Sequence, residues 1–183
     1  MALVSYPGSG NTWTRGIIER LSGYFTGRFY GEIMPVDCGC TVVQKTHDFQ
    51  KYDYKPFVNK SALLIIRNPY KALVSYRNFL TTGNNQTASA SLTQFTGPDL
   101  LQDKENQFRQ LMRYLGLEVD ERRLDCVIKH DFSSFKRNST RSTRNETIRD
   151  PFNSVLRGIV DKEIQIVQKA LTDYGYELKL TKE

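Results

Sequence analysis

A glycine-rich segment near the start of the chain has the residue types that bind phosphate. It reads Tyr6-Pro7-Gly8-Ser9-Gly10-Asn11-Thr12-Trp13. Its two glycines allow a tight turn that points backbone N–H groups inward, and Ser9, Asn11 and Thr12 add side-chain donors. A helix that begins here would add the positive end of its dipole. The segment lacks the lysine of a Walker loop, so it predicts either a different anion site or a plain strand-to-helix turn.

Two further segments carry residues suited to an anion and to proton transfer. Arg67 follows an apolar run and offers a planar fork of donors, and Ser75 comes eight residues later. Lys45 and His47 end another apolar run, and a histidine there can act as a general base near neutral pH. Residues two apart on a strand share a face, so Lys45 would place its charge beside the same reacting group. Taken singly, each of the four residues also fits an ordinary structural position.

The three segments follow elements that would bring them together. Apolar runs predict strands at residues 2–6, 41–45 and 62–66. Helical spacing predicts helices at 12–21, 70–79, 100–115 and 152–174. In the last helix, the side chains expected to face inward are Val155, Ile159, Ile164, Val167 and Leu171. Alternating strands and helices predict an α/β fold, a parallel sheet flanked by helices, in which ligands bind at the carboxyl ends of the strands.

Composition and charge limit the kinds of protein this chain can be. Its 183 residues suit a single domain, 1–183, and 39% hydrophobic content is typical of a globular chain rather than a disordered one. The longest apolar run, 62–66, is too short to cross a bilayer. Two histidines and three cysteines make no metal-ligand pattern, so no metal is predicted. The net charge of +6 fits a phosphate-rich small molecule or a polyanion. Aromatic residues are not interleaved with the basic run 136–144, which disfavours nucleic acid.

In this order, the motifs resemble those of the sulfotransferase family. The glycine-rich loop resembles the family's 5'-phosphosulfate loop, and the segment from Arg67 to Ser75 resembles its 3'-phosphate site. Lys45-Thr46-His47 is similar to the strand end that carries the catalytic histidine in the cytosolic branch. The segments Tyr114-Leu115-Gly116 and Ser134-Phe135 also match. The resemblance is greatest to the sulfotransferase-like domain of WSC domain-containing proteins, which share Tyr-Pro-Gly-x-Gly-Asn-Thr-Trp.

The resemblance implies a P-loop nucleotide-hydrolase-like three-layer sandwich that transfers a sulfuryl group from 3'-phosphoadenosine 5'-phosphosulfate to an acceptor hydroxyl or amine. The residues implied to bind the donor are Ser9, Gly10, Asn11, Thr12 and Trp13 at the 5'-phosphosulfate, Arg67 and Ser75 at the 3'-phosphate, and Phe135, with Trp13, at the adenine. His47 would take the acceptor proton, and Lys45 would offset charge at the transferring group. No metal is implied.

The chain departs from the family's pattern in three places. Position 8 is glycine, as in the WSC-type domains, where many sulfotransferases have lysine. Residues 81–96 are polar where the family has a helical stretch and a strand, so we expect the domain to lack one strand and to be incomplete around 81–98. If the sheet follows the family's order, this would leave an unpaired edge beside the first strand. The chain also starts at its first strand, so we expect it to be incomplete at the N-terminus, where glycan-modifying relatives carry an anchor.

Compartment and catalytic competence each have alternative interpretations. A Golgi or secretory glycoprotein is predicted if a full-length form carries an anchor, and a cytoplasmic protein otherwise. Four Asn-x-Ser/Thr sequons occur, at Asn59, Asn85, Asn138 and Asn145.

The basic run 136–144 is either a cap whose Arg141 or Arg144 closes on the 3'-phosphate or a solvated loop. The alternatives to an active enzyme are an inactive nucleotide-binding relative and a basic module that binds polyanions.

Overall fold

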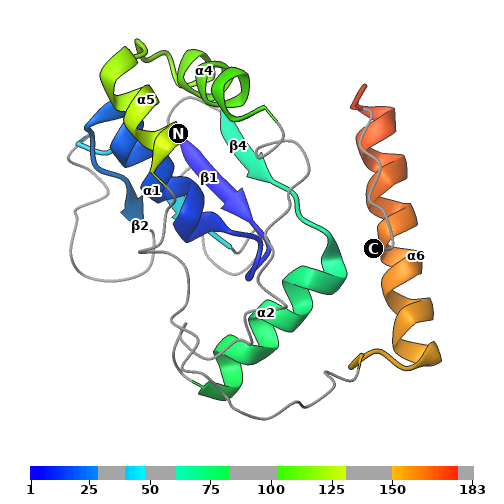
Figure 1. The fold of residues 1–183 in the computed structure, drawn as a ribbon. Helices are drawn as coiled ribbons and strands as arrows, with labels where there is room; N and C mark the ends of the chain where they lie inside the picture. The colour runs from blue at the N-terminus through cyan, green and yellow to red at the C-terminus, as the bar shows by residue number, and fades with distance from the viewer. Residues whose placement is uncertain (29–39, 48–60, 83–102, 131–149, 177–183) are drawn as a thin grey trace.

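A computed structural model describes residues 1–28, 40–47, 61–82, 103–130 and 150–176 of the chain (Figure 1). The strands in these residues are β1 (Ala2–Ser5), β2 (Gly27–Arg28), β3 (Gln44–Thr46) and β4 (Ala62–Ile65). The helices are α1 (Asn11–Ser22), α2 (Pro69–Thr82), α4 (Lys104–Tyr114), α5 (Glu121–Lys129) and α6 (Ser154–Asp173).

The described strands form one parallel sheet in the order β2-β3-β1-β4. Ala2 of β1 is in register with Gln44 of β3 on one side and with Ala62 of β4 on the other. The expected unpaired edge beside the first strand was therefore wrong, because the apolar strand β4 occupies that position. Within the described residues, β4 is the edge strand on this side of the sheet. An α/β fold with a parallel sheet is confirmed.

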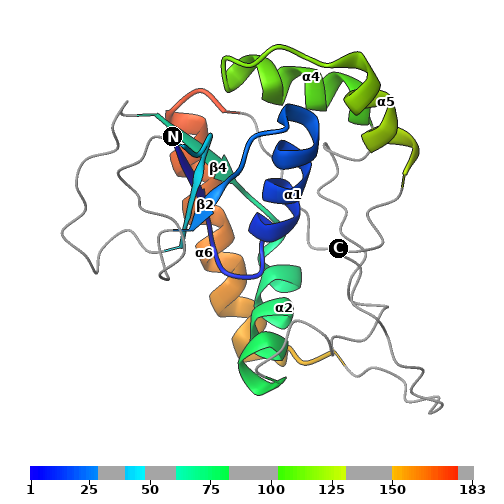
Figure 2. The same cartoon turned by 90° about the vertical axis from the view of Figure 1, so that its left-hand side faces the viewer.

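One face of the sheet is covered by α1 and α4. Leu3 of β1 packs against Ile18 of α1 and Val43, and Leu111 of α4 joins this cluster. A second cluster ties α1, α4 and α5 together, through Ile17, Leu21, Phe108, Met112, Leu124 and Val127. Figure 2 shows the three helices on the same side of the sheet. On the opposite face of β4, Leu64 is 53% exposed, so the described part fits a sandwich without showing its third layer.

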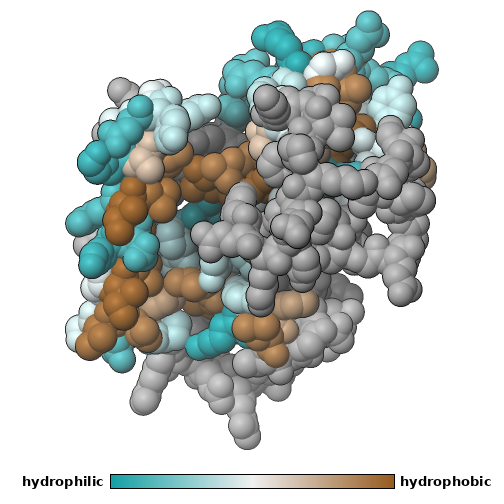
Figure 3. All heavy atoms as spheres, turned by 180° about the vertical axis from the view of Figure 1, so that it is seen from behind, coloured by the Kyte–Doolittle hydropathy of each residue, from teal (hydrophilic) through white to brown (hydrophobic). Residues whose placement is uncertain are grey.

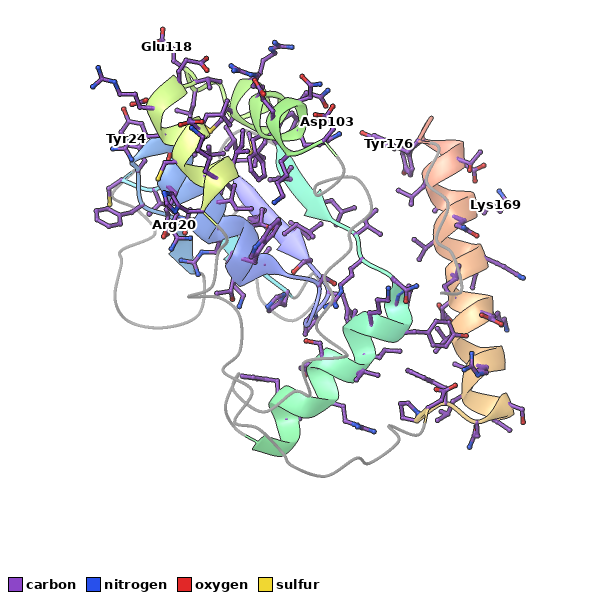
Figure 4. All side chains as sticks on the ribbon, in the orientation of Figure 1. Arg20, Tyr24, Asp103, Glu118, Lys169 and Tyr176 are labelled. Carbon is purple, nitrogen blue, oxygen red and sulfur yellow. The ribbon has the colours of Figure 1, made fainter. Side chains whose placement is uncertain are left out.

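Side-chain caps explain where three of the helices begin. Asp103, at the start of α4 (Figure 4), accepts a hydrogen bond from the backbone N–H of Asn106. Asp120 accepts from the N–H groups of Arg122 and Arg123 at the start of α5. Asn153 caps α6 in the same way. The sequence patterns missed α5, which is short and mostly charged. Asp120 just before it is a residue type that favours the N-terminus of a helix and could have indicated it.

The last helix buries a narrower stripe than its sequence suggested. Val160 and Ile164 of α6 pack against Tyr70 of α2, and the Tyr70 hydroxyl donates to Asp161 Oδ1 at 2.7 Å. Val155 and Ile159, expected to face inward, are 69% and 55% exposed.

The expected inward face of α6 was therefore wrong in part. Val167 is also exposed, and Leu171 is half-buried. The reason is that α6 packs on α2 beside the sheet rather than across it (Figure 1). Apolar side chains lie open along α6 (Figure 3), while Lys169 points away from the rest of the molecule (Figure 4). No helix among the described residues is long and apolar enough to cross a membrane.

The contact between α6 and α2 can be tested with a matched pair of isoleucines. Ile164 is 6% exposed and Ile166 is 52% exposed. We expect Ile164→Val to lower the free energy of unfolding by about 0.5–1.5 kcal/mol because it removes a buried methylene. Ile166→Val should change it by less than about 0.5 kcal/mol. Urea denaturation measures both values, and equal effects would contradict this packing.

Candidate functional site

The three chemistry-bearing segments meet at the carboxyl edge of the sheet. His47, just after β3, places Nδ1 at 2.9 Å from the backbone carbonyl oxygen of Ser5, the last residue of β1. Arg67, two residues past β4, donates from a terminal guanidinium nitrogen to the carbonyl oxygen of Gly8 at 2.6 Å. The structure therefore brings His47 to the end of β1 and Arg67 to the loop that follows it, as the parallel topology predicts.

Two glycines give the loop after β1 its shape. Gly8 and Gly10 have φ of 84° and 100°, which other residues rarely adopt. Gly8 also lies directly on α2, because a Cβ built on it would be 2.4 Å from the carbonyl oxygen of Ala72. This contact leaves no room for a side chain at position 8.

The first turn of α1 is open where the other helices are capped. Its cap residue is Gly10, which has no side chain to accept from the first turn, and that turn holds no acidic residue. The helices α4, α5 and α6 each have a polar side chain at this position. First-turn N–H groups and the positive end of the dipole favour an anion. Ser9 beside this turn is buried, and Thr12 is exposed.

Asn11 uses its amide group inside the protein. The side chain is buried, and Nδ2 donates to the carbonyl oxygen of Leu3 at 3.2 Å and to Ser5 Oγ at 3.1 Å. Its Oδ1 is buried without a hydrogen-bond partner among the described residues. Asn11 can therefore bind an anion through its backbone N–H but not through its side-chain amide. Its side chain ties the start of α1 to the end of β1.

His47 is a half-buried imidazole whose surroundings favour the neutral form over the charged one. Burial lowers its pKa from the ordinary value of 6.5, the Ser5 carbonyl raises it in part, and the charge of Lys45 lowers it again. Lys45 is thus close enough to act on the ring, as the two-residue spacing predicts. A neutral imidazole with a low pKa can accept a proton at neutral pH.

The remaining predicted site residues lie as follows. Arg67 and Ser75 are both buried, Arg67 under the loop and Ser75 on α2. Trp13 is half-buried against the cluster that joins α1, α4 and α5. Phe135, the basic run 136–144 and the four sequons lie outside the described residues. No group of three or more potential metal ligands occurs in the described ranges.

Sequence patterns missed one residue of this site. Ser5 was read only as part of a buried strand, yet its side chain, 0% exposed, touches both Asn11 and His47. The available signal was its position, because it is the polar end of an otherwise apolar strand immediately before the loop. A buried hydroxyl needs partners, and here the partners are site residues.

Comparisons with known proteins find relatives by sequence. The chain is 26% identical to a WSCD family member of Drosophila pseudoobscura pseudoobscura over 93% of its own length and 66% of the relative's. It is 24% identical to one of Drosophila melanogaster, with 91% and 64% covered, and 23% identical to one of Aedes aegypti, with 93% and 65% covered. No protein-family model matches the chain, and no solved structure matches it.

These relatives are longer than the chain within the matched region. The 93% of 183 residues that match, about 170, extend over 214 aligned positions, so about 44 positions of the Drosophila pseudoobscura relative have no counterpart here. The other two alignments leave about 43 and about 45 such positions. The chain spans 64–66% of the full length of the three relatives. Over almost all of its own length, then, this chain is similar to proteins named as WSCD family members.

Proposed function

We propose that the chain is a sulfotransferase that binds 3'-phosphoadenosine 5'-phosphosulfate at the carboxyl edge of its sheet. The observation that carries the proposal is the meeting of three features there. These are the uncapped first turn of α1, the buried cation Arg67 and the neutral imidazole of His47. The similarity to WSCD family members over 93% of the chain supports the same proposal.

Each part of the proposed site has a distinct role. The loop and first turn, from Ser9 to Trp13, would hold the 5'-phosphosulfate through backbone N–H groups and the helix dipole. Arg67 and Ser75 would hold the 3'-phosphate, and Trp13 and Phe135 would flank the adenine. The guanidinium of Arg67 would then have two roles, donating to the carbonyl of Gly8 and binding the 3'-phosphate.

Transfer itself would need a base and a cation. The acceptor oxygen or nitrogen forms a bond to sulfur while the bond from sulfur to the 5'-phosphate oxygen breaks, which leaves 3'-phosphoadenosine 5'-phosphate. His47 Nε2 would take the acceptor's proton, and Lys45 would offset the charge that develops on the leaving oxygen. Because position 8 has no room for a side chain, Lys45 is our candidate for the charge that a lysine in the loop supplies elsewhere.

A second candidate is a relative that binds the nucleotide without turnover. It is favoured by the roughly 44 positions of the relatives that this chain lacks, and by the exposed face of β4 at Leu64. Binding of 3'-phosphoadenosine 5'-phosphate without any sulfuryl transfer to a panel of sugar, phenol and amine acceptors would select this candidate over the first.

The nucleotide site is tested by comparing 3'-phosphoadenosine 5'-phosphate with AMP, which differ in the phosphate assigned to Arg67. We expect Arg67→Ala to weaken the binding of 3'-phosphoadenosine 5'-phosphate by roughly 1.5–3 kcal/mol, the range for a charged hydrogen bond. The binding of AMP should change much less. Calorimetry on the full chain measures both. Arg113→Ala, which removes an exposed arginine on α4, is the control. Equal weakening of both nucleotides would mean that Arg67 only supports the loop.

A further inference from the structure

The ring of His47 is held from one side by a single residue. Its Nδ1 lies 2.9 Å from the carbonyl oxygen of Ser5 and 3.2 Å from the Oγ of the same residue. A carbonyl oxygen can only accept a hydrogen bond, so the shorter contact requires a proton on Nδ1. In the neutral ring this leaves Nε2 without a proton and able to accept one.

The hydroxyl of Ser5 is itself held in place by Asn11. Asn11 Nδ2 donates to Ser5 Oγ at 3.1 Å and to the carbonyl oxygen of Leu3 at 3.2 Å. The contact with Leu3 orients the amide, because a carbonyl needs a donor there. Ser5 Oγ receives a hydrogen bond from Asn11. Because Nδ1 of His47 carries a proton, a lone pair of Ser5 Oγ faces the same N–H that the Ser5 carbonyl accepts. Ser5 and Asn11 are both almost wholly buried, so this network is shielded from water.

We propose that Ser5 and Asn11 are positioning residues that hold His47 in the Nδ1–H tautomer and present its Nε2 as the proton acceptor. This proposal rests on the proposed function, in which His47 is the base. It adds a physical link between the donor site and the base. Asn11 is the first residue of α1, whose open turn would bind the 5'-phosphosulfate, and its side chain reaches the residue that orients His47.

The tautomer can be measured without any substrate. We expect two-bond ¹H–¹⁵N correlation spectra of the uniformly labelled chain at pH 7.5 to show a protonated Nδ1 and an unprotonated Nε2 for His47. His130, the second histidine of the chain, is exposed and serves as an internal reference. An Nε2–H tautomer for His47 in the wild-type chain would overturn the proposal at once, with no variant needed.

Variants then test the two side chains. Ser5→Ala removes the Oγ acceptor and Asn11→Ala removes the donor that holds it, so in both variants Nδ1–H keeps only the Ser5 carbonyl as a fixed acceptor. Each should therefore introduce a population of the Nε2–H tautomer, and Ser5→Ala should lower kcat about tenfold with little change in the KM of the nucleotide. Ser22→Ala removes a comparable hydroxyl, bonded to the Ile18 carbonyl at the far end of α1, and should change neither quantity. An unchanged tautomer in Ser5→Ala and Asn11→Ala would overturn the proposal. Failure of the chain to bind 3'-phosphoadenosine 5'-phosphate would instead overturn the proposed function and leave the tautomer result intact.

Discussion

Replacing His47 by alanine is expected to lower sulfuryl transfer by roughly 10²–10⁴-fold, the usual contribution of a general base, while 3'-phosphoadenosine 5'-phosphate still binds. The imidazole is held at the end of β1 with Nδ1 on the Ser5 carbonyl, so its Nε2 is the nitrogen that can take a proton. Steady-state transfer rates and calorimetric binding on the same preparation measure the two quantities. His130→Ala, which removes the exposed histidine, should leave both unchanged.

The pH dependence of the same reaction gives an independent check. The base acts in its neutral form, and burial holds the pKa of His47 below 6.5. The rate should therefore rise with pH through a limb centred below 6.5 and be level at pH 7 and above. The unfolded chain binds this proton at higher pH than the folded one, so stability should also fall as pH drops below 6.5. A limb that persists in His47→Ala would assign the base to another group.

The second large effect is expected at Gly8. An alanine there would have to keep a φ of 84°, which costs about 1–2 kcal/mol, and its Cβ would be 2.4 Å from the carbonyl oxygen of Ala72. Relief of that overlap requires the loop and α2 to move apart, at a further cost of about 1–3 kcal/mol. We expect Gly8→Ala to lower the free energy of unfolding by about 2–5 kcal/mol and to abolish nucleotide binding.

Two other glycines separate the strain from the overlap. Gly116 and Gly175 have φ of 69° and 82°, and a Cβ on either would meet no atom within 4 Å. Gly116→Ala and Gly175→Ala should therefore cost only the strain, about 1–2 kcal/mol. Denaturant unfolding compares the three variants. If Gly8→Ala is no more destabilising than the other two, the loop does not lie on α2 in the way described.

The strands and their polar ends could be predicted from local patterns. Short apolar runs followed by Gly8, His47 and Arg67 predict a parallel sheet with a site at its carboxyl edge, because alternation of strands and helices leaves few other topologies. Local patterns failed where burial depends on distant partners. Ile159 has the spacing of a core residue but is exposed, because what covers a helix face is set by tertiary packing and not by the helix itself.

By itself, the amino-acid sequence determined the fold class, the glycine-rich loop and the residue types at the three strand ends, since these follow from periodicity, turn chemistry and the order of motifs. Only the tertiary structure decided which contacts those residues make with one another. It placed β4 beside β1, seated Gly8 on the backbone of α2, and turned the side chain of Asn11 inward toward Ser5 and His47. The physical reason is that these contacts join residues from different strands and helices. They depend on the register of the strands and on how the helices pack, and a local sequence pattern encodes neither.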